Sequence, residues 1–327
     1  MSDREIIITV KDIKKQFGEV EALAGIDFTI NRGELFGFLG PNGAGKTTTI
    51  NILTGLARPD SGVINISGID CRKHPRSTQH LIGVVPDESN LYPELTGFEN
   101  LCFCASLYGV RKRVRQERAV KLLRDFGLNA AANRKFGGYS KGMKRKITIA
   151  AGIIHQPEIL FLDEPTTGID VASARQVREL ISELHHAGTT IFLTTHYIEE
   201  AERLCDRIAF IVGGRIVRID TKDNLLQPVQ DKKVLRITVN ELPELIMSSL
   251  AEKYPGFTFT LQGNDILQIE AAENIPAGRI VHFLEEEGVE VSEARKVQPA
   301  LEEVFVKITG IGGNLMKKEK EQSGGKA

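Results

Sequence analysis

The sequence predicts an α/β fold for most of the chain and a smaller α+β domain at its C-terminal end. Short apolar segments alternate with segments of helical period through roughly the first 225 residues. A different succession of predicted strands and helices begins after Gln227-Pro228. The length of 327 residues also fits about two domains of the usual size of roughly 150 residues.

The expected strands of the first domain lie at 35–39, 63–67, 82–85, 159–162, 190–194 and 208–212. Each segment is short, consists mostly of β-branched residues, Leu or Phe, and is bounded by Gly, Pro, Asp or Asn. The clearest helix is expected over 171–187, where Val177, Leu180, Ile181 and Leu184 share one face. Apolar strands separated by helices are typical of a parallel sheet that is covered on both sides. The segments 208–212 and 215–219, which flank Gly213-Gly214, are instead expected to form a tight hairpin.

The second domain is expected to follow the order β-α-β-β-α-β-α. Its strands are predicted at 235–239, 257–261, 266–269 and 289–291, and its helical stripes at 242–250, 280–284 and 301–308. This order within about 80 residues is ferredoxin-like. The predicted divisions are therefore 1–228, 229–312 and a tail, 313–327, which is expected to be disordered because it has no large apolar residue from Lys317 onward.

A glycine-rich loop follows the expected strand 35–39 and precedes an apolar helix. It reads Gly40, Pro41, Asn42, Gly43, Ala44, Gly45, Lys46 and Thr47, with Thr48 next, and it fits the pattern G-x-x-x-x-G-K-[ST]. Glycines let successive backbone N–H groups point at phosphate oxygens, and the helix that follows adds the positive end of its dipole. Lys46 can reach the β- and γ-phosphates, and the Thr47 hydroxyl can ligate Mg²⁺. The loop therefore predicts a P-loop NTPase core.

Two acids, Asp163 and Glu164, end the expected strand at 159–162. Ligands bind at the carboxyl ends of the strands in an open parallel sheet, so both side chains are candidates for the site. Asp163 can hold Mg²⁺ through its water shell. Glu164 points differently and can polarise a water toward the γ-phosphate. The alternative interpretation is the start of a solvated loop with two ordinary acids.

With these residues in view, the chain resembles the ATP-binding subunit of an ABC transporter. Five motifs occur in a fixed order over residues 4 to about 225. The phosphate loop is followed by Leu81-Ile82-Gly83-Val84-Val85-Pro86-Asp87, Tyr139-Ser140-Lys141-Gly142-Met143, Asp163-Glu164-Pro165-Thr166-Thr167-Gly168-Ile169-Asp170 and Thr194-Thr195-His196. The resemblance implies a P-loop NTPase core with an antiparallel β subdomain and a helical subdomain at about 88–155.

The same resemblance implies roles for the segment at 139–143, called here the signature segment. In that family two subunits sandwich ATP head to tail, so Ser140, Lys141 and Gly142 would contact the nucleotide of the partner. The helix after Gly142 would aim its N-terminus at that phosphate. Asp170 would link the two sites across the interface.

The remaining implied roles belong to the chain's own nucleotide. His196 would hydrogen-bond the γ-phosphate and would complete the catalytic set with Glu164 and Lys46. A histidine after a strand is otherwise usually just a polar loop residue. Phe17 stands where the family places an adenine-stacking aromatic, although a lone Phe is also an ordinary core residue.

Two positions depart from the family's pattern. Asp87 replaces a glutamine, and its carboxylate would bring another negative charge near Mg²⁺ or its water, so metal ligation through Asp87 is one interpretation. The other is that Asp87 caps a turn after Pro86. Lys141 replaces a glycine of the signature segment, which would add a cation or block close approach to phosphate. Ser140 and Gly142 match the pattern, so function is expected to survive.

The C-terminal segment 299–310 is similar to the ending of exporter subunits of the daunorubicin- or multidrug-resistance type. The resemblance therefore implies an ATPase that powers export through a separate membrane permease, with ATP and Mg²⁺ as cofactors and a head-to-tail homodimer as the working form. The transported substrate is left open, as are the choice between homodimer and heterodimer and the role of the C-terminal domain.

Three other functions are less consistent with the sequence. A soluble ABC ATPase that acts on ribosomes or DNA usually carries two cassettes or a long coiled coil, and this sequence has one cassette and no sustained heptads. A nucleotide sensor without hydrolysis is disfavoured by Glu164. GTPases are disfavoured because the guanine motif Asn-Lys-x-Asp does not occur.

Composition limits the partners and the location. The formal net charge of −1 argues against coating of nucleic acid. The basic run at 111–118 is expected to be a solvated helix face, with contact to anionic headgroups as the alternative. The chain has neither the basic flank of a signal peptide nor a run of roughly 20 apolar residues. We expect a cytoplasmic protein held at the inner face of the cell membrane through its permease.

Overall fold

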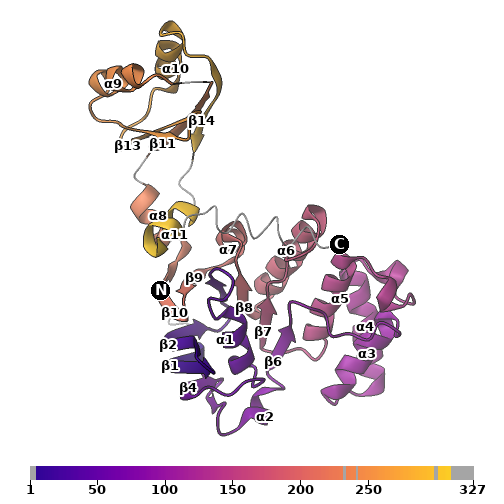
Figure 1. The fold of residues 1–327 in the computed structure, drawn as a ribbon. Coiled ribbons are helices and arrows are strands. Elements are labelled where there is room, and N and C mark those ends of the chain that lie inside the picture. Colours follow the sequence, from indigo (N-terminus) through magenta and orange to yellow (C-terminus); the bar gives the residue numbers. More distant parts are fainter. Residues whose placement is uncertain (1–4, 231–232, 241, 298–300, 311–327) are drawn as a thin grey trace. The chain divides into compact units, whose positions relative to one another are not determined.

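The computed structural model describes residues 5–230, 233–240, 242–297 and 301–310. Among these residues, contacts group the chain into two compact units (Figure 1), one of residues 5–222 with 308–310 and the other of residues 223–307. The predicted tail at 313–327 lies outside the described residues. No described helix is long and apolar enough to cross a membrane.

The elements of the first unit form two sheets and the helices around them. The strands are β1 Ile6–Phe17, β2 Val20–Asn31, β3 Leu35–Leu39, β4 Ser61–Ile66, β5 Ile69–Asp70, β6 Ile82–Val85, β7 Ile159–Asp163, β8 Thr190–Thr195, β9 Arg207–Val212 and β10 Arg215–Thr221. The helices are α1 Lys46–Leu53, α2 Pro75–Thr78, α3 Gly97–Leu107, α4 Lys112–Asp125, α5 Lys141–Ile153, α6 Val171–His186 and α7 Ile198–Leu204, with short 3₁₀ turns at Asn129–Ala131 and Phe136–Gly138.

The larger sheet carries the strands that sequence periodicity predicts. Its order is β10-β9-β3-β8-β7-β6, and every neighbouring pair is parallel except β9 and β10. All residues of β3, β7 and β8 are buried, as expected for strands that are covered on both faces. The predicted hairpin is confirmed, because β9 and β10 pair in antiparallel register across Gly213-Gly214.

The smaller sheet corrects one prediction. The segment predicted at 63–67 is not part of the parallel sheet: as β4 it pairs antiparallel with β1 in a second sheet of order β2-β1-β4-β5. Val63 is exposed, whereas Ile64 and Ile66 are buried. This alternation is typical of an antiparallel strand with one face on the core.

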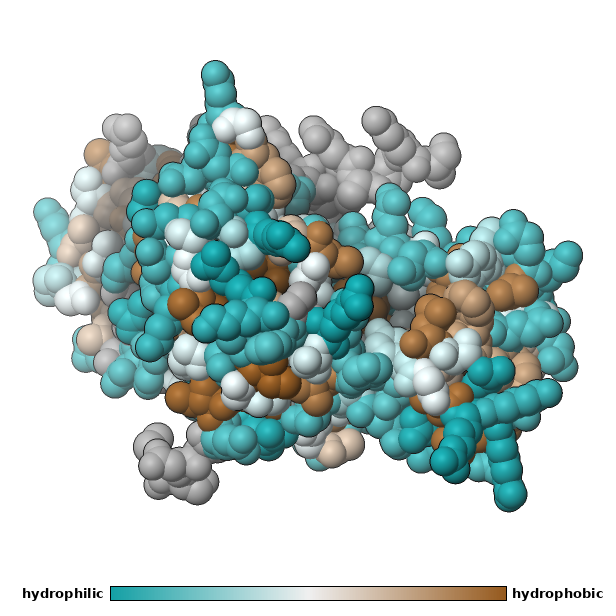
Figure 2. Space-filling model, turned by 90° about the horizontal axis from the view of Figure 1, so that it is seen from below, coloured by the Kyte–Doolittle hydropathy of each residue, from teal (hydrophilic) through white to brown (hydrophobic). Residues whose placement is uncertain are grey.

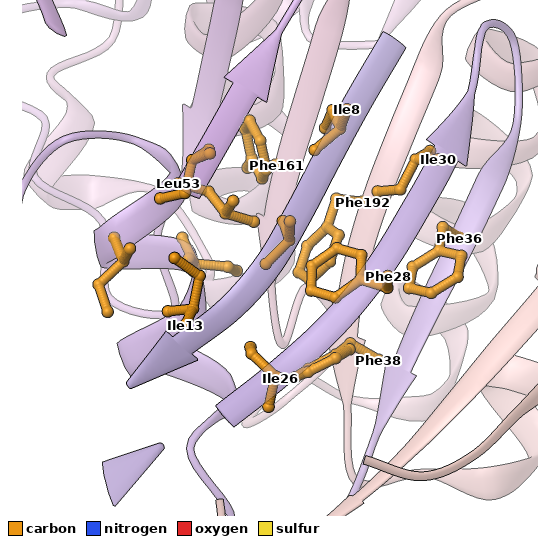
Figure 3. Packing of buried hydrophobic residues seen from close by; sticks show 14 of the residues in the cluster. Ile8, Ile13, Ile26, Phe28, Ile30, Phe36, Phe38, Leu53, Phe161 and Phe192 are labelled. Atoms are coloured by element: carbon orange, nitrogen blue, oxygen red, sulfur yellow. The ribbon is translucent and has the colours of Figure 1, made fainter. Parts of the chain in front are cut away.

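The core of this unit lies between the two sheets and α1 (Figure 3). Ile8, Ile26 and Phe28 of the smaller sheet face Phe36 and Phe192 of the larger one in one buried cluster. The ring of Phe192 is central to this cluster, with the centroids of four other phenylalanine rings at 5.4–6.0 Å, those of Phe28, Phe36, Phe38 and Phe161. The core therefore fixes the position of β8 between β3 and β7.

Phe192→Ala is expected to lower the free energy of unfolding by about 3–5 kcal/mol, since the fully buried ring would leave a cavity that stacked neighbours cannot fill. Urea denaturation followed by circular dichroism measures the change. Phe17→Ala is the matched control, because that ring is 53% exposed and its loss should cost less than about 1 kcal/mol. Equal losses in the two variants would contradict this account of the core.

The second unit folds around its own core. Its elements are α8 Lys222–Gln230, β11 Lys233–Val239, α9 Glu244–Lys253, β12 Thr258–Gln262, β13 Ile266–Ala271, α10 Ala277–Glu286, β14 Val291–Val297 and α11 Leu301–Thr309. The sheet order β12-β13-β11-β14 is antiparallel throughout, and the elements follow the predicted β-α-β-β-α-β-α sequence. Helix α8 continues through 227–228, where the sequence predicts a boundary.

One residue of the predicted stripe at 242–250 does not belong to the core of this unit. Leu242, Ile246 and Leu250 are buried against the sheet, but Leu245 is exposed. The reason is that α9 begins only at Glu244, so Leu242 reaches the core from the preceding turn and Leu245 is left on the outer face.

Candidate functional site

The glycine-rich loop joins β3 to α1 with the backbone that the motif predicts. Gly45 is the N-cap of α1 with φ 103°, and a Cβ there would lie 2.6 Å from the carbonyl oxygen of Ala22. A Cβ at Gly40 would clash with the carbonyl oxygen of Ile211. Both positions therefore require glycine. Ala44 is buried, whereas Asn42, Gly43 and Thr47 are exposed, and Pro41 and Thr48 are half-buried.

Lys46, the first residue of α1, turns its ammonium group back over this loop. Its side chain is 5% exposed, and Nζ donates to the carbonyl oxygens of Gly40 (2.9 Å) and Pro41 (3.0 Å). Nζ also lies 3.1 Å from Oε1 of Glu164. The cation is thus held at the entrance of the loop and joined to the acid that follows β7.

Glu164 and His196 follow the carboxyl ends of the neighbouring strands β7 and β8. Nδ1 of His196 lies 2.5 Å from Oε2 of Glu164, and the same oxygen accepts from Thr167 Oγ1 at 2.9 Å. The backbone of Glu164 has φ 46°, a left-handed conformation that is uncommon for a residue with a side chain. Its N–H donates to the carbonyl oxygen of Thr194 at 3.1 Å, which holds that conformation in place.

The surroundings of Glu164 set its protonation. Burial by itself raises the pKa of this carboxyl, but the hydrogen bond with His196 and the charge of Lys46 outweigh burial and lower the pKa to about 2. The group is therefore ionised at neutral pH. Any ligand that drew Lys46 and His196 away would leave burial as the larger influence and raise the pKa.

Asp163 lies one residue before Glu164, at the end of β7, and is buried. Its Oδ1 accepts a hydrogen bond from Thr194 Oγ1 at 2.5 Å. Thr47, the second residue of α1, is exposed and directly follows the same loop. The alternative interpretation, two ordinary acids at the start of a solvated loop, does not fit, because Asp163 is buried and Glu164 is only 11% exposed.

Asp87 follows β6 and is held by an arginine from α5. Nη2 of Arg145 lies 3.3 Å from Oδ1 of Asp87 and donates to the backbone oxygen of the same residue at 2.5 Å. Partial burial raises the pKa of Asp87, the charge of Arg145 opposes that rise, and the carboxylates of Glu164 and Asp163 add to it. Asp87 therefore lies within electrostatic range of both acids. Its side-chain contact is an ion pair with Arg145 and not the turn cap of the alternative interpretation.

The signature segment forms a second group, at the start of α5. Ser140 is the N-cap of that helix, and its Oγ accepts from the N–H of Met143 at 3.2 Å. The helix thus begins at Lys141, which is exposed, and not after Gly142 as the resemblance implies. A Cβ at Gly142 would clash with Oγ of Ser173, so the signature glycine packs directly on α6.

Asp170 completes this second group. As the N-cap of α6 it accepts from the N–H and the Oγ of Ser173 at 2.9 and 2.7 Å. Among the described residues, no hydrogen bond or ion pair joins Ser140, Lys141 or Gly142 to the phosphate loop. The candidate residues therefore fall into two separate groups within one chain.

Phe17 ends β1 and is exposed, which excludes the interpretation as a core residue. Nζ of Lys15 lies 5.1 Å from the centre of its ring. An exposed ring beside a cation is accessible for stacking on a planar ligand.

Three contributors were not predicted from the sequence, namely Thr167, Thr194 and Arg145. Thr194 and Thr167 belong to quoted motifs, but their hydroxyl contacts with the two acids depend on how neighbouring strand ends meet. Arg145 did leave a signal. It is three residues after Gly142 and four before Ile149, which is the spacing of one helix face, and both of those residues are buried.

Comparison with known proteins gives the following similarities. The sequence profile described as ABC transporter matches residues 23–167. The linearmycin resistance ATP-binding protein LnrL of Bacillus subtilis (strain 168) is 36% identical over 311 residues, which are 93% of this chain and 98% of that protein. The daunorubicin/doxorubicin resistance ATP-binding protein DrrA of Streptomyces peucetius is 36% identical over 306 residues, 93% of this chain and 92% of that protein.

Solved structures agree with these similarities. An ATP-binding subunit of an ABC transporter matches with a TM-score of 0.62 and 32% identity, over 68% of this chain and 93% of that chain. A dimeric ATP-binding cassette in a post-hydrolysis state, bound to ADP and Pi, matches with a TM-score of 0.61 and 27% identity, over 66% of this chain and 99% of that chain.

Proposed function

Since this chain belongs to the ABC transporter family as an ATP-binding subunit, we propose that it hydrolyses ATP to power export through a separate membrane permease. The observation that carries the proposal is the convergence of Lys46, Glu164 and His196 at the phosphate loop. These side chains supply a cation for the phosphates, a carboxylate for the attacking water and a hydrogen-bonding imidazole. The resistance names of the relatives favour export over uptake.

In the proposed reaction, water attacks the γ-phosphate in line and ADP leaves. The loop N–H groups and Lys46 neutralise the charge that spreads over the phosphate oxygens. When Lys46 and His196 turn to the γ-phosphate, the pKa of Glu164 rises from about 2, which makes its carboxylate a better acceptor for the proton of water. The site thus prepares its base only when the nucleotide is in place.

The donor set near the loop fits Mg²⁺. Among the described residues, no cluster of three or more His, Cys, Asp or Glu side chains is arranged to enclose a metal. Mg²⁺ is usually held by one or two carboxylates together with substrate phosphates, and Thr47 and Asp163 would offer such a partial set, with the carboxylate of Asp87 within electrostatic range of Asp163. Bound there, the ion would neutralise phosphate charge.

We infer that two copies of the chain act together, head to tail. The two separate groups of candidate residues support this arrangement, because among the described residues no hydrogen bond or ion pair joins the signature segment or Asp170 to the phosphate loop. The positive end of α5, with Ser140 as its N-cap, would then point at the partner's γ-phosphate. Lys141 would add a cation to the same phosphate.

The helical part between β6 and β7 is the proposed contact for the permease. Exposed apolar side chains gather on and beside α3, where Tyr92 is 50% exposed, Leu107 is 68% exposed and Phe103 packs edge-on against Tyr92. Figure 2 shows brown apolar patches among hydrophilic side chains at its right, over α3 and α4. Apolar patches of this kind are typical of protein interfaces. The chain would thereby be held at the inner face of the cell membrane.

Fractionation of a lysate that contains the tagged chain tests the proposed function. We expect the chain in the membrane fraction of cells that make its permease, its loss from that fraction in cells that lack the permease, and MgATP hydrolysis by the purified protein. Recovery with ribosomes or DNA, independent of any permease, would favour the soluble ATPase instead.

Phe17→Ala is expected to weaken MgATP binding by roughly 5- to 150-fold, because stacking of a base on an aromatic ring is worth about 1–3 kcal/mol. Titration with a fluorescent ATP analogue measures the affinity, and binding of MgGTP to the same variant shows whether the ring prefers adenine. Phe103→Ala is the matched control, since that ring is also exposed but lies on α3. An unchanged affinity of Phe17→Ala for MgATP would show that the Phe17 ring is not part of the nucleotide site.

A further inference from the structure

We propose that Arg145 is a positioning residue that ties the loop carrying Asp87 to the helix carrying the signature segment, so that this loop and this helix move together when nucleotide binds. This inference rests on the proposed function, because it concerns how the chain's own ATP site controls what it presents to its partner.

Arg145 is deeply buried on α5, two turns or less from the signature residues at the start of that helix. Its side chain is only 7% exposed. Nη1 donates to the carbonyl oxygen of Pro86 at 2.7 Å, and Nη2 donates to the carbonyl oxygen of Asp87 at 2.5 Å and pairs with Oδ1 of Asp87 at 3.3 Å. One guanidinium group thus holds two backbone oxygens and one carboxylate of the same short loop.

A second contact lies one turn further along the same face of α5. Oγ1 of Thr148 is 2.8 Å from Oγ of Ser89, which is hydrogen-bond distance between two hydroxyls. Arg145 and Thr148 are three residues apart and therefore point to the same side of the helix. The loop from Pro86 to Ser89 is attached to α5 at both ends.

The two parts that Arg145 joins face different nucleotides. Asp87 lies close enough to Asp163 and Glu164 for their charges to act on it, so its loop borders the chain's own phosphate site. In the part of the chain that the structure describes, Ser140 and Gly142, at the other end of the attachment, make no hydrogen bond with that site. Among the described residues, Arg145 makes no hydrogen bond or ion pair with Lys46, Glu164 or His196, which is why we assign it positioning and not chemistry.

The geometry requires arginine at this position. A guanidinium group is planar and presents its N–H donors in a fixed fork, so it can hold two carbonyl oxygens and a carboxylate at once. A lysine ammonium could replace only part of that set. A movement of Asp87 toward phosphate would therefore displace α5 in the natural chain. It would displace α5 much less in a variant that lacks the guanidinium group.

Hydrogen exchange of the full chain, with and without the non-hydrolysable analogue MgAMP-PNP, tests the proposal. In the natural chain we expect protection on binding at 40–48, 86–89 and 140–146. In Arg145→Met, protection at 40–48 should persist, with an affinity for MgAMP-PNP within about threefold of the natural chain. Protection at 140–146 should fall, and the kcat for MgATP should drop about 2- to 30-fold with little change in KM, the range for altered coupling.

Arg118→Met is the matched control. Arg118 also bridges helices by donating to the carbonyl oxygen of Ile154 at 3.0 Å and to Gln156 at 2.6 Å, but it does not touch the loop 86–89. This variant should keep the protection at 140–146. Arg145→Lys should fall between the natural chain and Arg145→Met, and it decides the question if the methionine variant does not fold.

Failure of the proposed role of Arg145 and failure of the proposed ATP site would give different exchange results. Nucleotide-dependent protection of 140–146 in Arg145→Met and Arg145→Lys equal to that of the natural chain would overturn the role of Arg145. An absence of protection at 40–48 in the natural chain would instead reject the proposed ATP site, whatever the arginine variants do.

Discussion

Glu164→Gln is expected to lower MgATP turnover roughly 10²–10⁴-fold, the usual effect of losing a general base. The substitution keeps the shape of the side chain but removes the charge that pairs with Lys46 and His196. An uncharged amide accepts a proton from water poorly, so the attacking water is no longer activated. The rate of phosphate release under saturating MgATP measures the effect.

Binding must survive in the same variant if Glu164 acts in chemistry. We expect MgATP to bind with unchanged or tighter affinity, since one negative charge beside the phosphates is gone, and to hold two subunits together in analytical ultracentrifugation. Glu158→Gln is the matched control, because Glu158 directly precedes the same strand and pairs with Arg32 at the surface. Turnover in Glu164→Gln equal to that of this control would reject the assignment.

Lys46→Ala is expected to weaken MgATP binding by roughly 10²-fold. Each hydrogen bond to a charged group contributes about 1.5–3 kcal/mol, and Lys46 offers the one buried ammonium that the described residues direct over the loop. The loss should appear in the dissociation constant. It should persist at saturating Mg²⁺, since the missing charge belongs to the protein.

The substitution also leaves the carboxylate of Glu164 buried without its ammonium partner, so unfolding must be monitored beside binding. Lys14→Ala is the matched control, because Lys14 is exposed and pairs with Asp12 at the surface. If Lys46→Ala folds and binds MgATP as tightly as this control, the loop is not the phosphate site.

Sequence periodicity located the buried strands of the larger sheet well. The segments predicted at 35–39 and 82–85 are β3 and β6 to the residue, because continuous apolar runs bounded by polar or glycine residues leave little choice of period. The strand at 63–67 was located but assigned to the wrong sheet. Its apolar residues fit either sheet, and its antiparallel pairing with β1, in which Ile66 lies opposite Ile8, decides between them.

The smaller sheet was expected from the family resemblance alone. Strand β1 mixes Lys, Asp and Gln with its apolar residues, and its register against β2 shifts between Val10 and Ile13, so neither period is regular. Asp12, in that interval, has a left-handed φ of 46°. Irregular strands of this kind carry little periodic signal.

The sequence motifs identified the candidate site residues, but their distances and contacts became known only from the fold. That Lys46, Glu164 and His196 meet follows from the order β3-β8-β7, which places three carboxyl ends side by side. The ion pair between Asp87 and Arg145 could not be predicted from the sequence, since it depends on how α5 packs beside the loop after β6. The interpretation of Asp87 as a metal ligand stays a prediction. Domain boundaries likewise stay predictions.

The left-handed backbone at Glu164 has a consequence for the evolution of the chain. An L-residue with φ 46° carries a conformational penalty of about 1–2 kcal/mol, which glycine would not. Glycine at position 164 would remove this penalty, but it would also leave the buried ammonium of Lys46 without its carboxylate partner, and breaking a buried ion pair costs about 3–5 kcal/mol. The strained glutamate is therefore expected to persist even when a population is selected for heat resistance alone, since the ion pair that it makes outweighs the strain that it carries.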